Sequence, residues 1–75
     1  MPHVIVKLCP GRSEQQKFQL AEAIAKDIVS IAKCEETAVS VVIEEIVPEA
    51  WAEQVYHADI KTAGDRLYKK PGYEM

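Results

Sequence analysis

The sequence is poor in the features that mark several large classes of protein. Its 75 residues include only two cysteines, Cys9 and Cys34, too few for the disulfide framework that holds many small secreted domains together. The longest apolar run, residues 39–43, is interrupted by a serine, whereas a membrane-spanning helix needs roughly 20 apolar residues. We therefore expect no membrane association and no signal peptide, and reduced thiols in the cytoplasm.

Positive charge is also scarce. The chain has 9 lysines and arginines against 12 acidic residues, a net charge of -3, so it lacks the broad basic surface that supplies most nucleic-acid affinity. DNA and RNA are therefore not expected as partners. His57 has no second ligand at a spacing typical of metal sites, and no metal is expected.

Apolar residues, by contrast, are plentiful for so short a chain, at 48% of the sequence. A chain of this size forms one domain, expected over residues 1–75, and buries only about 60 to 65% of the surface that its unfolded form exposes. Apolar faces that one copy leaves uncovered are typical of interfaces. We therefore expect a homo-oligomer.

The order of the expected elements indicates an α+β fold. Alternation of Val4, Val6 and Leu8 predicts a strand over residues 3–8. A capping box from Ser13 to Gln16 predicts a helix that runs to about residue 33. β-branched residues predict a second strand over 39–46. These elements form a βαβ unit, with parallel strands and a crossover helix that packs on the sheet. The predicted apolar stripe of the helix consists of Leu20, Ala21, Ile24, Ile28, Ile31 and Ala32.

The remaining third of the chain is predicted to be helical. Pro48 is expected to start one turn over residues 48–51, and a weaker helical pattern, interrupted by Gly64, covers residues 55–70. The basic residues of segment 69–73 suit the carboxyl end of this helix, and a turn follows them.

Pro2 is the first candidate for chemistry. An initiator methionine is normally removed when proline follows it, which would leave Pro2 with a free secondary amine. Apolar or cationic surroundings lower the pKa of such an amine, and a neutral amine acts as a general base near neutral pH. Proline is equally tolerated at the first position of a strand, so the Met-Pro start does not assign a function by itself.

The wider pattern resembles the 4-oxalocrotonate tautomerase family. The resemblance covers residues 2 to about 51 and rests on Pro2, the short first strand, segment 11–17 (GRSEQQK), the helix and the second strand. It implies that Pro2 is the catalytic general acid and base, that Arg12 binds a substrate carboxylate, and that Trp51 forms an apolar wall of the site. It implies no cofactor. A guanidinium suits this role because it grips a carboxylate through two parallel hydrogen bonds.

One position departs from the family pattern. Ser40 occupies the place of a second arginine that polarises the substrate carbonyl in the family, which argues against a dicarboxylate substrate. The longer tail, especially segment 69–73, resembles the branch that acts on enols of aryl pyruvates such as phenylenolpyruvate. This resemblance implies a 2-oxo or enol carboxylate substrate and a homodimer rather than a hexamer.

Two alternatives stay open from the sequence. The same fold also serves proline-based dehalogenases and hydratases. A second possibility is a non-enzymatic oligomer that binds an aromatic acid and retains Met1, which would keep the proline nitrogen in an amide. His3 is expected to be a solvated or hydrogen-bonded neighbour of the site, and nothing in the sequence marks Cys9 as reactive.

Overall fold

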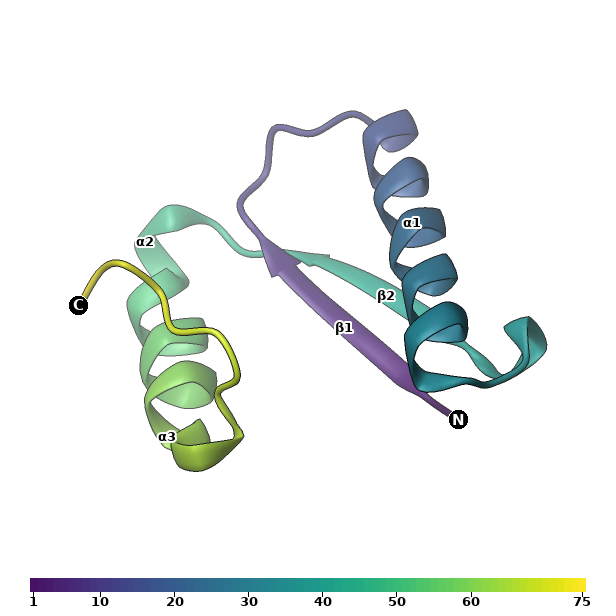
Figure 1. The fold of residues 1–75 in the computed structure, drawn as a ribbon. Helices are drawn as coiled ribbons and strands as arrows, with labels where there is room; N and C mark the ends of the chain where they lie inside the picture. Colours follow the sequence, from purple (N-terminus) through teal and green to yellow (C-terminus); the bar gives the residue numbers. More distant parts are fainter. The chain divides into compact units, whose positions relative to one another are not determined.

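The computed structural model describes all residues from 1 to 75 and divides them into two compact units, Met1–Glu45 and Ile46–Met75. The first unit holds β1 (His3–Leu8), α1 (Glu14–Ala32), a 3-10 turn (Glu36–Ala38) and β2 (Ser40–Glu45) (Figure 1). The second unit holds α2 (Pro48–Trp51), a π-helical segment (Ala52–Ile60), α3 (Lys61–Ala63) and a 3-10 turn (Gly64–Arg66). No helix has the length and apolar content that crossing a membrane requires.

The first unit is the βαβ unit that the sequence predicts. β1 and β2 form a parallel two-stranded sheet in a register that runs from the pair His3–Ser40 to the pair Leu8–Glu45. α1 connects the two strands and lies across one face of the sheet (Figure 1). The α+β fold class, with parallel strands and a crossover helix, is therefore confirmed.

The start of α1 is fixed by hydrogen bonds between Ser13, which directly precedes the helix, and Gln16 in its first turn. The Ser13 hydroxyl accepts from the Gln16 backbone N–H at 3.1 Å, and the Gln16 side-chain oxygen accepts from the Ser13 backbone N–H at 2.9 Å. This reciprocal capping box satisfies amides that the helix itself leaves unpaired. The helix ends at Lys33, which adopts the left-handed conformation with φ 59°. Both ends agree with the prediction.

The face that α1 buries is narrower than predicted. Its half-buried apolar residues are Ala21, Ile24, Ala25, Ile28 and Val29. Leu20 and Ala32 are exposed, and Ile31 is 79% exposed, so the prediction that these three pack on the sheet is wrong. A sheet of only two strands covers a smaller arc of the helix than the apolar residues of α1 span. Phe18, 74% exposed, extends the uncovered apolar surface.

The second unit is built around Val55, which is 5% exposed. Pro48 occupies the start of α2, as predicted. The helical region then continues without a break through the π-helical segment, and the backbone N–H of Lys61 bonds to the Tyr56 carbonyl five residues earlier. The predicted helix over 55–70 is therefore wrong at both ends, because the helical region begins before residue 55 and ends before residue 70.

Gly64 ends the helical region earlier than predicted. Its φ of 58° with ψ of -128° departs from helical geometry, and such a φ favours glycine because glycine has no Cβ. After the 3-10 turn at Gly64–Arg66 the chain is irregular, so Lys69 and Lys70 do not cap a helix. The expectation of one domain over residues 1–75 stays a prediction.

Candidate active site

Backbone hydrogen bonds hold the segment around Pro2 beside the start of β2. The Pro2 carbonyl accepts from the Ser40 N–H at 3.2 Å, and the Met1 amine donates to the Ala38 carbonyl at 2.6 Å. Pro2 is half-buried. With Met1 attached, the proline nitrogen is an amide without a basic lone pair. The structure thus places Pro2 at the end of the sheet where both strands begin.

A side-chain pair lies directly next to Pro2. His3 and Ser40 occupy opposite positions in the strand register, and the His3 Nδ1 atom is 2.6 Å from the Ser40 Oγ atom. Both residues are exposed. His3 is thus a hydrogen-bonded neighbour, as the sequence suggests, but its partner follows only from the register of two strands that are distant in sequence.

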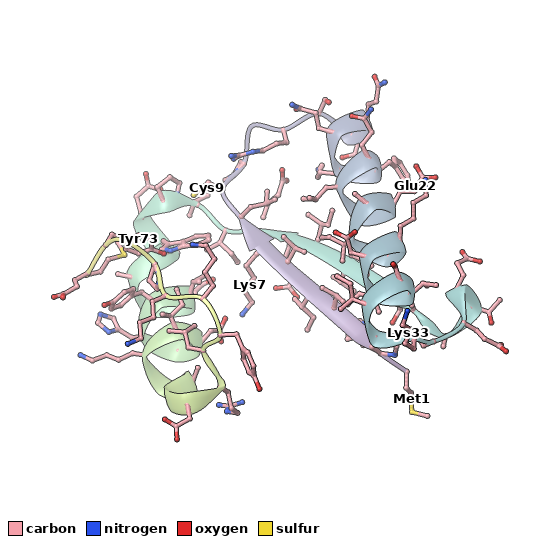
Figure 2. All side chains as sticks on the ribbon, in the orientation of Figure 1. Met1, Lys7, Cys9, Glu22, Lys33 and Tyr73 are labelled. Carbon is pink, nitrogen blue, oxygen red and sulfur yellow. The ribbon has the colours of Figure 1, made fainter.

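This pair lies on the sheet face that points away from α1, which we call the outer face. Val41 and Ile43 line a groove together with α1 residues, and successive strand residues point to opposite faces. His3, Ile5, Ser40 and Val42 therefore belong to the outer face. Figure 2 shows the Lys7 side chain leaving β1 on the same side, away from α1.

Arg12 lies between β1 and α1, at the opposite end of β1 from Pro2. Figure 1 shows the loop that joins these two elements at the arrowhead of β1. Its Nη1 atom donates to the Cys9 carbonyl at 3.1 Å, and the rest of the guanidinium is exposed. Gly11 has a φ of 128° and gives the loop a conformation that other residues rarely adopt. Strand β1 separates Pro2 from Arg12 by about 20 Å, at roughly 3.3 Å per residue. A single copy therefore does not bring these two predicted site residues together.

Trp51 ends α2 in the second unit and is half-buried. Its indole Nε1–H donates to the Tyr73 hydroxyl at 3.0 Å. The Tyr73 ring lies 5.7 Å from the Tyr56 ring, which in turn makes an edge contact with His57 at 5.3 Å. The irregular tail is thereby attached to the helical region. No local pattern in the chain indicated that Tyr73 would pair with Trp51.

Lys17 is a residue of α1 whose side chain reaches the far end of β2. Its Nζ atom is 2.6 Å from a Glu14 carboxylate oxygen and 3.4 Å from one of Glu45. The hydrogen bond to Glu14 raises the pKa of Lys17. The adjoining groove, of about 230 Å³, is lined by Glu14, Lys17, Phe18, Ala21, Val41 and Ile43. Because Lys17 is already paired with two carboxylates, it is a poor candidate for binding an acidic substrate.

A parallel βαβ unit whose first strand starts directly after Pro2 is the layout of a small tautomerase, and comparison with known proteins agrees. The family model described as "Tautomerase enzyme" matches residues 2–56. A probable tautomerase of Xylella fastidiosa (strain 9a5c) is 45% identical over 73 residues, which cover 97% of this chain and 89% of that protein. Tautomerase PptA of Cronobacter sakazakii (strain ATCC BAA-894) is 40% identical over 76 aligned positions, which cover both chains in full.

The solved structures show the same relationship. TomN, described as a 4-oxalocrotonate tautomerase homologue in the tomaymycin biosynthetic pathway, superposes with a TM-score of 0.65 at 36% identity, over 67% of this chain and 77% of TomN. The chain belongs to the 4-oxalocrotonate tautomerase family. It is an enzyme of the isomerase class, and the prediction of a tautomerase is confirmed.

Proposed function

We propose that this tautomerase interconverts the enol and keto forms of an aryl 2-oxo acid such as phenylpyruvate, with the amine of Pro2 as general acid and base after removal of Met1. The full-length similarity to proteins described as Tautomerase PptA carries this proposal. The place of Pro2 supports it, because the Pro2 carbonyl accepts a hydrogen bond from the Ser40 N–H of β2, a contact that does not involve Met1. A base held in this way keeps a constant position relative to a bound substrate.

The proposed reaction moves one proton and requires no cofactor. In the direction of ketonisation, the neutral amine of Pro2 takes the proton from the C2 hydroxyl of the enol. The C2–O bond becomes a carbonyl as the C2=C3 double bond donates its electron pair to a proton at C3, which the protonated amine delivers. The amine ends neutral, so it is ready for another cycle.

The other two site residues are assigned to substrate binding. Arg12 holds the carboxylate, since its guanidinium has exposed donors beyond the one used on Cys9. Trp51 supplies an apolar wall for the aryl group. Because about 20 Å of strand separates Pro2 from Arg12 within one chain, we propose that Arg12 reaches the site from a second copy of a homodimer.

The test of the base is the Pro2→Ala variant, assayed by phenylenolpyruvate ketonisation after mass spectrometry has established that Met1 is removed from both proteins. We expect kcat to fall by about 10²- to 10⁴-fold, the usual contribution of a positioned acid–base group. Arg12→Ala should mainly raise KM, because it removes binding to the unreacting carboxylate. Unchanged turnover in Pro2→Ala would refute the proposed base.

Mixing the two variants tests the shared site. In a dimer that exchanges its subunits, a mixed pair of Pro2→Ala and Arg12→Ala copies contains one site with both residues intact. Random exchange therefore restores about a quarter of the native sites. Activity below KM should rise above that of either variant alone, and an activity equal to their average would place both residues in sites within one chain.

A further inference from the structure

The His3–Ser40 pair is the polar group on the outer face that lies closest to Pro2. Consecutive Cα atoms are 3.8 Å apart, so His3 adjoins Pro2 along the chain. Ser40 adjoins it across the sheet, where its backbone N–H bonds to the Pro2 carbonyl. The side chains of the pair are joined at 2.6 Å between Nδ1 and Oγ. The pair is therefore attached to Pro2 through both strands.

The His3–Ser40 pair has two hydrogen-bond donors and uses only one of them within the pair. A neutral histidine carries one ring N–H and a serine carries one O–H. If Ser40 donates to Nδ1, the ring N–H at Nε2 of His3 is free. If Nδ1 donates to the hydroxyl, the Ser40 O–H is free. In both arrangements the exposed pair offers one N–H or O–H donor to a ligand on the outer face.

Tautomerisation needs a donor at this place. Negative charge develops on the C2 oxygen as the enol proton leaves, and donors positioned at such an oxygen lower the barrier. Within the chain, Arg12 lies about 20 Å from Pro2 along β1, and Lys17 is paired with Glu14 and Glu45. Neither of these two cations is therefore available to an oxygen at Pro2 from the same chain.

The neighbouring positions suit an aryl acid. The register pair next to His3–Ser40 on the outer face is Ile5–Val42, whose side chains are 53% and 40% exposed. The outer face thus presents a donor next to Pro2 and an apolar surface one pair further along the strands. An aryl 2-oxo acid has the same sequence of groups, an oxygen at C2 followed by an apolar ring.

We propose that the His3–Ser40 pair donates a hydrogen bond to the C2 oxygen of the substrate and so stabilises the enolate during proton transfer. This inference rests on the proposed tautomerisation at Pro2. The residue whose hydrogen is free touches the oxygen, and the other fixes the direction of that hydrogen. The pair acts as one unit, so losing either member removes the donor or its orientation.

The first experiment measures binding and does not depend on turnover. Two probes differ only at C2: phenylpyruvate carries the oxygen, and 3-phenylpropanoate lacks it. By calorimetry, Ser40→Ala should raise the Kd of phenylpyruvate by about three- to tenfold, the worth of one hydrogen bond, and leave that of 3-phenylpropanoate within about twofold. Ser30→Ala, on exposed α1 surface, is the matched control. An equal effect on both probes, no effect on either, or no binding of phenylpyruvate by the unaltered protein would overturn the inference.

The second experiment tests whether the two residues act together. Ser40→Ala and His3→Leu should each lower kcat for phenylenolpyruvate by about 10- to 100-fold, somewhat less than for an oxyanion donor in a dry site. The double variant should be no worse than either one, because coupled residues are not additive. Ser40→Thr keeps the hydroxyl and should recover most of the rate, whereas His57→Gln should match the wild type. Additive losses, or a loss at only one of the two positions, would refute the pair.

Failure of the inference and failure of the proposed base give different results. Pro2→Ala should abolish turnover and leave the Kd of phenylpyruvate near that of the unaltered protein. If Pro2→Ala keeps its turnover while Ser40→Ala still discriminates between the probes, the base is wrong and the oxygen contact stands. If Pro2→Ala is inactive and Ser40→Ala behaves like Ser30→Ala, the base stands and the oxygen contact is wrong.

Discussion

Removing one oxygen atom from Tyr73 tests what holds Trp51 in place. Tyr73→Phe deletes the hydroxyl that accepts from the indole N–H at 3.0 Å and keeps the ring that contacts Tyr56. A hydrogen bond of this length contributes about 0.5 to 1.5 kcal/mol net. Tyr73 is 44% exposed, so water can replace its hydroxyl and the loss should fall near 0.5 to 1 kcal/mol. That loss reduces the ratio of attached to detached tail about two- to fivefold.

Fluorescence gives a direct assay, because Trp51 is the only tryptophan in the chain. A freed indole gains water contact, so Tyr73→Phe should shift its emission to longer wavelength and raise acrylamide quenching. Tyr68→Phe is the control, since Tyr68 is 99% exposed. If Trp51 forms the proposed apolar wall, KM for the aryl acid should rise in the Tyr73 variant with little change in kcat. Emission, quenching and KM that match the control would refute the reasoning.

Two further predictions concern the stability of the first unit, measured by urea unfolding at one fixed protein concentration. Ser13→Ala removes the capping hydroxyl of α1 and should cost about 1 kcal/mol, whereas Ser30→Ala should change stability by less than about 0.5 kcal/mol; equal effects would show that the cap contributes nothing. Lys17→Met removes the ion pair with Glu14. Because this contact raises the pKa of Lys17, its stabilisation is fully present below the ordinary lysine pKa of about 10.4 and is lost as the pH rises through the raised value. The difference from wild type should therefore shrink as the solution becomes strongly alkaline, and a Lys26→Met control should show no such trend.

Local rules account for the parts of the fold that the sequence predicted well. The alternation in β1 and the capping box of α1 depend on residues within a few positions of each other, and short-range preferences of this kind are visible in sequence. The helical end of the second unit was misplaced because Gly64 takes a conformation that ends the helix. A glycine in a helical pattern is compatible with either continuation or termination, and packing decides between them.

The candidate site likewise combines residues that the sequence predicts with contacts that only the packing of distant segments decides. Sequence by itself determined the candidates Pro2, Arg12 and Trp51 and the family to which the chain belongs, since a motif and its spacing are local properties. Tertiary structure alone decided that His3 bonds to Ser40, 37 positions away, and that the Trp51 indole bonds to Tyr73. It also showed that a full strand separates Pro2 from Arg12. The physical reason is that strand register and side-chain contacts depend on how distant segments pack, and no short stretch of the chain encodes them.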